Sequence, residues 1–412
     1  MVDSASRWPR RRTARISRRG LIIGTGALAV AGLAGGGLAR ALHSPTVGVR
    51  PIAGAPPVPS AATSLSLSPQ QRIGQLFMAG LPSGASGSDL DQTNAAISSF
   101  HAGNVVLFGT GWSSGDVLRS ALKPLQALAE DANSGVRLFI SGNQEGGQLG
   151  VFQAFYGPGF SPIPSPITQA QGDPTKLQEQ ARIWGDQLLN AGVNLNLAPV
   201  LDTVPADTVA SNDPIGHWGR EYGFTPDDVA TYGVAFERGM RDAQIAVSIK
   251  HFPGLGRVTG NTDFTAEGIV DTVFSGTDDP YLKPYKAGID AGADFVMMSL
   301  AVYPRVDTQP AVFSSAMING ILRNSLGFKG VVVTDDVGAA AAVADRPPAQ
   351  RALDFLRAGG DMILTVKPSD IEPMSRAVSQ AMAGDAAFAA QVNASVDRIL
   401  RLKGAYGLLP SA

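Results

Sequence analysis

The chain has no cysteine, only four histidines, and few aromatic or charged residues, and these shortages exclude several kinds of site. Without cysteine there is no disulfide framework, zinc ribbon, iron–sulfur cluster or thiolate nucleophile. The histidines and carboxylates do not fall at metal-ligand spacing, so we expect no metal and no cofactor. Hydrophobic residues make up 44% of the 412 positions, enough for one large core or two modest ones.

Basic residues are concentrated at the start of the chain. Residues 1–41 hold eight of the 33 basic residues but one of the 35 acidic ones, leaving 25 basic and 34 acidic residues beyond them. An excess of negative charge is repelled by phosphate backbones and anionic lipid. We therefore expect no nucleic acid and no membrane surface as a partner of the folded part.

The first 41 residues have the layout of an export signal. The pair Arg18-Arg19 precedes an uncharged stretch at 21–39, which indicates the twin-arginine route. The alternative is an uncleaved membrane anchor, because such a stretch approaches the roughly 20 residues that span a bilayer. Six glycines weaken a spanning helix, and Ala39-Arg40-Ala41 is a candidate cleavage site. We expect an extracytoplasmic protein, secreted or anchored, with residues 42–68 as a Pro/Ala/Ser-rich linker.

Eight short apolar runs recur after the linker. They lie at residues 73–81, 104–109, 137–141, 193–200, 245–250, 295–300, 330–334 and 362–366. Each is continuously apolar, which indicates strands covered by protein on both faces. With helical spacing between most of them, they predict an α/β fold, a (β/α)8 TIM barrel. A doubly wound open sheet is the alternative, but its glycine-rich dinucleotide fingerprint is missing after the first run.

Helix boundaries are marked by capping residues. A capping side chain followed by proline occurs at Ser68-Pro69, Asp173-Pro174 and Thr225-Pro226. Glycines at 192, 292 and 359 stand where a helix would close and a strand begin. We expect residues 69–412 to form a single domain that begins after the linker.

Polar residues gather at the carboxyl ends of five predicted strands. They are Asn143 to Gly147, Asp202, Lys250 to Gly254, Tyr303-Pro304 and Asp335-Asp336. In a barrel these ends meet at one mouth, where catalytic groups are found. Each alone has a simpler explanation, since an aspartate after a strand is commonly a helix cap. Their joint occurrence predicts a functional site at the mouth.

Four segments resemble the signatures of glycoside hydrolase family 3. They are Lys-His-Phe-Pro-Gly-Leu-Gly at 250–256, Val-Val-Val-Thr-Asp-Asp at 331–336, Gln-Glu-Gly-Gly at 144–147 and Leu-Ala-Pro-Val-Leu-Asp at 197–202. The similarity is closest to the single-barrel β-N-acetylglucosaminidases that act on peptidoglycan sugars. It implies a barrel, a carbohydrate substrate and exo-acting, retaining hydrolysis of terminal β-linked sugars. We expect no protein partner and a monomer.

The resemblance assigns Asp335 as the catalytic nucleophile. A retaining glycosidase needs one carboxylate to attack the anomeric carbon and a second group to protonate the leaving oxygen. Asp335 occupies the family position at the end of a buried strand, and Asp336 should point away and serve the following turn. The alternative is that Asp335 only caps the next helix.

Three basic residues are implied to bind the sugar. Lys250 and His251 correspond to family residues that hold hydroxyl groups, and Arg220 matches a family arginine, although the spacing before it is one residue longer. A Schiff-base role for Lys250 is the chemical alternative, which the following His-Phe-Pro-Gly disfavours. A buried lysine there would also keep a neighbouring carboxylate ionised.

The proton donor departs from the family pattern. In the N-acetylglucosaminidase branch the loop after Lys-His-Phe-Pro-Gly ends in Asp-Ser-His, and its histidine transfers the proton; here the stretch is Asn261-Thr262-Asp263. By position Asp263 replaces the histidine. A carboxylic acid serves if an apolar or anionic surrounding raises its pKa, which Phe264 and Asp335 could supply. The alternative is that Asp263 is a turn residue.

Three further departures concern substrate binding. Asn143 stands where the family has a sugar-binding aspartate, and Gln148 and Val151 replace two arginines. An amide still binds hydroxyls, though less strongly than a carboxylate. Three hypotheses stay open: a β-N-acetylglucosaminidase acting on cell-wall glycan fragments, a β-glycosidase for another sugar, and a sugar-binding protein without turnover.

Overall fold

The computed structural model describes residues 66–109, 111–148 and 152–411. The predicted export segment, nearly all of the predicted linker and Val151 lie outside the described residues. Among the helices of the described part, none is both long and apolar enough to cross a membrane.

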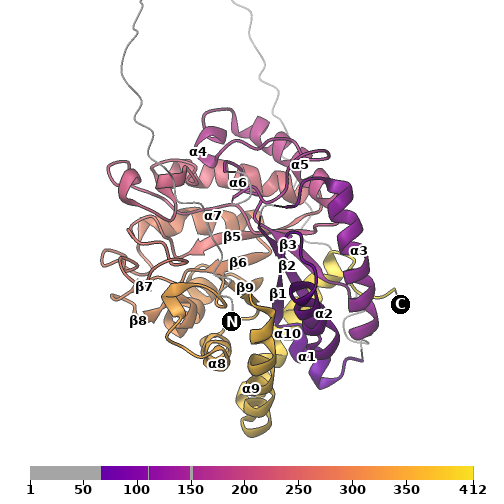
Figure 1. The fold of residues 1–412 in the computed structure, drawn as a ribbon. Helices are drawn as coiled ribbons and strands as arrows, with labels where there is room; N and C mark the ends of the chain where they lie inside the picture. Colours follow the sequence, from indigo (N-terminus) through magenta and orange to yellow (C-terminus); the bar gives the residue numbers. More distant parts are fainter. Residues whose placement is uncertain (1–65, 110, 149–151, 412) are drawn as a thin grey trace, which may run out of the picture. The chain divides into compact units, whose positions relative to one another are not determined.

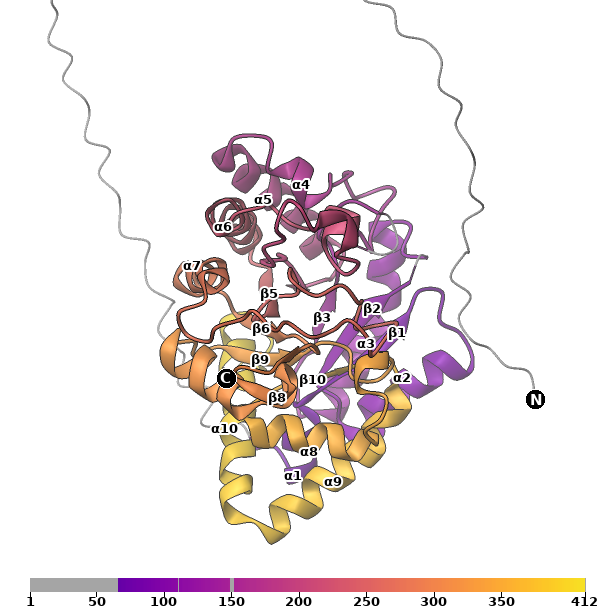
Figure 2. The same ribbon diagram turned by 90° about the vertical axis from the view of Figure 1, so that its left-hand side faces the viewer.

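Within the described residues, eight parallel strands form a closed barrel, which confirms the predicted (β/α)8 architecture. The strands are β1 (Phe77–Pro82), β2 (Asn104–Phe108), β3 (Phe139–Gly142), β4 (Leu195–Asn196), β5 (Ala246–Phe252), β6 (Phe295–Met298), β9 (Val331–Thr334) and β10 (Ile363–Thr365). They pair in the order β10-β1-β2-β3-β4-β5-β6-β9, and a parallel bridge from Val333 to Met362 closes the ring. Figures 1 and 2 show the strands at the centre and the helices outside them.

Continuous burial explains why the apolar runs are strands. All four residues of β9, for example, are buried, because the core fills one face and helices cover the other. Two boundaries differ from the prediction. Ile73 belongs to a helix, since Ser68 and Gln71 form a reciprocal capping box that starts α1 (Pro69–Gly74). The fourth run pairs regularly only at β4, because Pro199 has no N–H to continue the ladder.

The helices alternate with the strands along the chain. They are α2 (Ser88–Phe100), α3 (Gly115–Ala132), α4 (Pro166–Gln169), α5 (Pro174–Asn190), α6 (Pro226–Asp242), α7 (Lys283–Ala291), α8 (Pro348–Ala358), α9 (Ile371–Gly384) and α10 (Ala386–Ala405), with a π-helical segment at Ala316–Ser325. The predicted caps Asp173 and Thr225 accept hydrogen bonds from the first turns of α5 and α6. Gly292 and Gly359 close α7 and α8 with φ of 106° and 105°, a conformation that favours glycine.

Helix α10 seals the amino-terminal end of the barrel. The ammonium of Lys403 donates to Gln75 Oε1, to the carbonyl of Gly103 and to the carbonyl of Arg137, which precede β1, β2 and β3. Burial among these neutral acceptors holds the pKa of Lys403 well below its usual value. This end is closed by packing, which leaves the opposite mouth for a site.

A small hairpin adds to the mouth after β6. It consists of β7 (Val302–Tyr303) and β8 (Asp307–Pro310), which pair antiparallel. The Tyr303 hydroxyl donates toward the Gly254 carbonyl at 2.8 Å and lies 3.1 Å from the Ser299 hydroxyl. Tyr303, predicted at the mouth, therefore fastens the sixth loop to the fifth.

Candidate active site

A buried carboxylate with two cations forms the floor of the barrel mouth. Glu145, on the loop after β3, accepts two hydrogen bonds of 2.8 Å from Nε and Nη2 of Arg220. Its Oε1 also lies 2.6 Å from Nζ of Lys250, on β5. The side chains of Glu145 and Lys250 are 1% and 2% exposed. The loops after β3 and β4 and the strand β5 thus meet at one carboxylate.

Charge pairing keeps this carboxylate ionised. Burial alone would raise the pKa of Glu145, but the charges of Arg220 and Lys250 outweigh it and lower the pKa to about 2. Burial lowers the pKa of Lys250 below its usual value, an effect that Glu145 opposes. Lys250 is therefore paired with a carboxylate, and the charge of Arg220 adds to the lowering of its pKa.

Arg220 is largely committed to this network. Besides Glu145, it donates from Nη1 to the carbonyl of Pro214 at 2.8 Å, and its guanidinium stacks 4.3 Å from the Phe152 ring centre. One N–H on each terminal nitrogen remains for a ligand. Arg220, predicted to bind sugar, therefore lies in the mouth, but two of the hydrogen bonds that it donates hold Glu145.

Asn143 joins the network on the side of Lys250. Its Oδ1 accepts from Lys250 Nζ at 3.1 Å, and it is half-buried. In the part of the chain that the structure describes, its amide nitrogen has no hydrogen-bond partner and can donate to a ligand. Asn143 and Lys250, both predicted to bind sugar, are thus neighbours.

His251 is held by a second buried carboxylate. Its Nδ1 lies 2.7 Å from Oδ2 of Asp202, on the loop after β4, and its backbone N–H donates to Asp202 Oδ1 at 3.2 Å. Asp202 Oδ1 also accepts from the Tyr285 hydroxyl and the Leu255 amide, both at 2.8 Å. Burial raises the pKa of Asp202, but the contacts with His251 and these donors lower it overall. Asp202 therefore fixes the imidazole orientation and directs Nε2 away from the carboxylate.

Asp335 and Asp336 follow β9 with different surroundings. The Asp335 amide donates to the Met298 carbonyl at 3.3 Å, which continues the pairing of β9 with β6 to the mouth. Asp336 accepts from the amides of Gly338 and Val366 through Oδ1, and from that of Ala339 through Oδ2. This confirms that Asp336 serves the following turn.

The side chain of Asp335 makes few contacts with protein. Its Oδ1 accepts one hydrogen bond of 2.9 Å, from the Asp336 amide, and the residue is half-buried. It interacts electrostatically with both Lys250 and Asp263. A carboxylate with free lone pairs beside two potential partners is suited to attack a bound substrate.

Asp263 stands on the loop after β5 and is brought toward β9 by backbone bonds. The carbonyls of Thr262 and Asp263 accept from the amides of Ala342 and Ala341, which lie in the loop after β9. The Asp263 amide donates to Asn261 Oδ1. Asn261, which replaces the family aspartate, is thus a turn residue, whereas Asp263 is tied to the segment that follows Asp335.

The surroundings of Asp263 favour its protonated form. Partial desolvation by the surrounding protein, together with the charges of Asp335 and Asp336, raises the pKa of Asp263 to about 7, and Arg220 and Lys250 oppose this shift. Asp263 is nevertheless an exposed residue, so water screens part of these interactions. The shift is upward in either case, as a proton donor requires.

Aromatic rings stand beside Arg220. The Phe152 ring packs edge-on against Trp218 at 5.8 Å, and Trp218 against His217 at 4.8 Å. Trp218 is half-buried and His217 exposed. His101, in contrast, bonds the Ala132 carbonyl and ends α2, which is a structural role.

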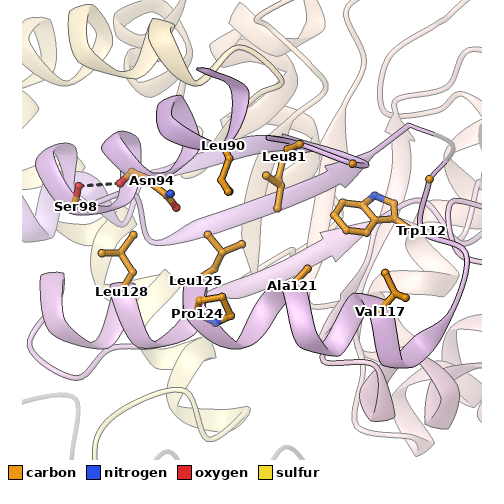
Figure 3. A pocket seen from close by; sticks show the side chains of 13 residues that line it. Leu81, Leu90, Asn94, Ser98, Trp112, Val117, Ala121, Pro124, Leu125 and Leu128 are labelled. Carbon is orange, nitrogen blue, oxygen red and sulfur yellow. Dashed lines mark hydrogen bonds between the residues drawn. The ribbon is translucent and has the colours of Figure 1, made fainter. Parts of the chain in front are cut away.

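An apolar cavity of about 600 Å³ lies elsewhere, between α2 and α3 (Figure 3). Leu81, Leu90, Trp112 and Leu125 line it, and no lining residue is ionisable. Hydrolysis of a glycosidic bond needs carboxyl groups, so this cavity is not the catalytic site. Among the described residues no group of three histidines or carboxylates is arranged to hold a metal ion.

Comparisons with known proteins agree with this barrel. A sequence model of the glycosyl hydrolase family 3 N-terminal domain matches residues 69–402. A beta-hexosaminidase of Xanthomonas campestris pv. campestris strain B100 is 34% identical over 281 residues, 67% of this chain and 80% of that protein.

Solved structures give the same result. A β-N-acetylhexosaminidase from Beutenbergia cavernae is similar at 44% identity with a TM-score of 0.79, over 82% of this chain and 99% of that one. A family 3 β-N-acetylglucosaminidase from Paenibacillus sp. is similar at 30% identity with a TM-score of 0.72, over 84% of this chain and 64% of that one. The protein is a glycoside hydrolase that acts on O-glycosyl bonds, a β-glycosidase. It belongs to glycosyl hydrolase family 3.

Sequence reasoning assigned no role to Glu145 or to the carboxylate of Asp202, which organise the predicted binding residues. One signal was available for Glu145: a lysine inside a continuously apolar strand needs an anionic partner. The choice of partner depends on loops far apart in the chain, which a single sequence does not reveal.

Proposed function

We propose that this β-glycosidase is an exported, exo-acting β-N-acetylglucosaminidase that removes terminal N-acetylglucosamine from peptidoglycan-type glycan fragments with retention of configuration. The names of its relatives, beta-hexosaminidase and β-N-acetylglucosaminidase, support the choice of sugar. The arginine pair and apolar stretch before residue 41 support export, and an extracytoplasmic enzyme meets cell-wall glycan.

The observation that carries the mechanism is the convergence of two loops on one edge of the mouth. Asp335 directly follows β9, and the loop carrying Asp263 is hydrogen-bonded to residues 341 and 342 in the loop after β9. One carboxyl group has open lone pairs and the other has a raised pKa. A retaining glycosidase needs such a pair.

In the first step, an oxygen of Asp335 attacks the anomeric carbon while Asp263 gives its proton to the glycosidic oxygen. The bond to the leaving group breaks, the aglycone departs as an alcohol, and a glycosyl ester of Asp335 remains. In the second step, Asp263, now ionised, takes a proton from water as the water oxygen attacks the same carbon. The ester bond breaks, and both carboxyl groups return to their starting states.

The remaining residues bind and orient the sugar. Lys250 and the amide nitrogen of Asn143 can donate to hydroxyl groups, and His251 offers Nε2 because Asp202 occupies Nδ1. Arg220 contributes its remaining N–H groups. Each donor is held by a buried carboxylate or a neighbouring donor before substrate arrives, which reduces the cost of ordering the site.

A substrate panel tests the proposal. Purified protein is incubated with the 4-nitrophenyl β-glycosides of N-acetylglucosamine, N-acetylgalactosamine, glucose and xylose, and NMR records the anomer formed first. We expect the highest kcat/KM for N-acetylglucosaminide and initial release of the β-anomer. Release of the α-anomer contradicts the retaining mechanism. Preference for another sugar contradicts the assigned substrate and points to Asn143 and Gln148 as its cause. Sugar binding by folded protein without product contradicts turnover.

The pH dependence follows from Asp263. Its pKa is raised from 3.8 to about 7, so the proton needed for catalysis is present below that pH and lost as pH rises through it. We expect kcat/KM for methyl β-N-acetylglucosaminide, whose leaving group needs protonation, to fall about tenfold per pH unit well above 7. Rates measured between pH 5 and pH 9 check this. A decline that is complete by pH 5.5 contradicts a raised pKa for the proton donor.

A further inference from the structure

The loop that carries Asp263 has a narrow neck. The amides of Thr259 and Gly260 both donate to the carbonyl of Gly268 at 2.9 Å, which closes residues 260–268 into a compact excursion. Beyond the neck the chain pairs with β7, since the Val302 amide donates to the Ile269 carbonyl and the Asp271 amide to the Val302 carbonyl. We call residues 257–259 the outgoing limb of this loop and residues 268–281 its returning limb. The position of Asp263 therefore depends on how these two limbs are held.

Arg257 joins the two limbs. It lies on the outgoing limb, two residues before the neck, and its guanidinium donates to both oxygens of Asp279 at 2.9 and 2.7 Å. Its Nη1 also lies 3.5 Å from Oδ2 of Asp271 on the returning limb. Its guanidinium carbon stacks 3.7 Å from the ring centre of Tyr281.

The two carboxylates organise the returning limb in turn. Asp271 Oδ1 accepts from the amides of Val273 and Phe274, and Asp279 accepts from those of Ser275 and Tyr281. Both backbone turns thus depend on carboxylates that the same guanidinium holds.

Burial makes this cluster sensitive to the loss of its cation. The side chain of Arg257 is 13% exposed, and those of Asp271 and Asp279 are 4% and 2% exposed. Among the described residues, Arg257 is the basic side chain within 4.0 Å of either carboxylate. Two buried carboxylates without a cation repel each other and lose stabilisation that hydration does not replace.

We propose that Arg257 is a positioning residue for the proton donor: through Asp271 and Asp279 it fixes the neck of the loop, and so the place of the Asp263 carboxyl group over the glycosidic oxygen. The proposal rests on the proposed function, in which Asp263 donates that proton. Arg257 itself is bound to protein and acts only through the loop.

Misplacement of a proton donor has a specific kinetic signature. Proton transfer requires a hydrogen-bond distance between acid and leaving oxygen, and a shift of about 1 Å can cost about 100-fold in rate. A leaving group that departs as a stable anion needs no proton. Comparing such a substrate with one whose leaving group needs a proton therefore distinguishes a misplaced Asp263 from damage to the rest of the site.

The test compares two substrates in the variants Arg257→Gln and Arg257→Lys. For methyl β-N-acetylglucosaminide we expect kcat/KM to fall about 10- to 100-fold in Arg257→Gln. For the 2,4-dinitrophenyl glycoside we expect a change of less than about threefold, since its departure needs little protonation. Arg257→Lys, which keeps the charge but not the fork geometry, should recover part of the loss.

Arg323→Gln is the matched control. Arg323 lies 2.6 Å from Asp361 with similar burial, 11% and 0% exposed, and Asp361 precedes β10 at the closed end of the barrel. Asp361 keeps a second cation, Arg398, whose Nη1 lies 2.6 Å from its Oδ1, so we expect a smaller fall in thermal stability than in Arg257→Gln and no dependence on the leaving group. If Arg257→Gln does not fold, the variants Asp271→Asn and Arg257→Lys take its place. Asp271→Asn retains an oxygen for the Val273 and Phe274 amides. The role of Arg257 is then judged by the same comparison of kcat/KM on the two substrates.

An equal loss on both substrates, or no loss on either, overturns the role of Arg257. Asp263→Ala separates this outcome from failure of the proposed function. If Asp263→Ala shows the leaving-group dependence and the Arg257 variants do not, the positioning role alone is wrong. If Asp263→Ala lacks the dependence, the assignment of Asp263 is wrong, and the positioning role fails with it.

Discussion

Replacing Asp335 by asparagine is expected to lower kcat by about four orders of magnitude or more, because without a carboxylate nucleophile no glycosyl ester forms. The asparagine can keep the hydrogen bond that Oδ1 accepts from the Asp336 amide, so the strand end should stay in place. The measurement is steady-state hydrolysis of the 2,4-dinitrophenyl glycoside. This substrate needs little help in leaving and so reports mainly on nucleophilic attack.

Asp336→Asn is the matched control, one residue further along. Its Oδ1 can still accept from the amides of Gly338 and Val366, while the bond from Ala339 to Oδ2 is lost. We expect a small decrease in melting temperature and activity within about tenfold of wild type. If the two variants lose activity equally, Asp335 has no special role at the end of β9.

Asp263→Ala is expected to lower kcat/KM for methyl β-N-acetylglucosaminide by about 100- to 10,000-fold, the usual contribution of a general acid. For the 2,4-dinitrophenyl glycoside kcat/KM should change little, because the first step no longer requires a proton. Its kcat should still fall, since the second step loses the base that activates water.

Azide distinguishes this role from general damage. A small anionic nucleophile replaces water without base catalysis, so azide should raise kcat of Asp263→Ala on the dinitrophenyl substrate and yield the β-glycosyl azide. Thr262→Ser, a change one residue earlier that keeps the hydroxyl group, should respond to azide no more than the wild type does. Absence of rescue, with loss on both substrates alike, would place the acid elsewhere.

Much of the fold was predictable because burial on both faces leaves a direct trace in sequence. Runs such as Val331-Val332-Val333 have no alternation, and Asp173 and Thr225 mark the starts of helices by their capping chemistry. The boundaries failed where a local interaction overrode the apolar pattern, as the Ser68 capping box did at Ile73.

The sequence predicted which residues form the site better than it predicted the contacts between them. The motifs brought Lys250, His251, Arg220 and Asn143 to the mouth, but the sequence did not reveal that Glu145 and Asp202 hold them. Glu145 and Arg220 are 75 residues apart in the chain. Such pairings arise only when the barrel closes and brings separate loops together.

The replacement of the family aspartate by Asn143 reduces the negative charge around Lys250. With Asn143 neutral, the ionised groups nearest Lys250 are Glu145 and Arg220, and Asp335 adds a further negative charge. A carboxylate at position 143 would add another and compete for Lys250. A neutral amide there leaves Lys250 paired with Glu145.

The most direct test of the account is to trap the intermediate. The protein is incubated with 5-fluoro-β-N-acetylglucosaminyl fluoride, which slows the second step more than the first, and the modified peptide is sequenced by mass spectrometry. The account predicts one sugar attached to the peptide that contains residues 331–336, at Asp335. A label on another residue, or none while the protein still turns over the unfluorinated substrate, would contradict it.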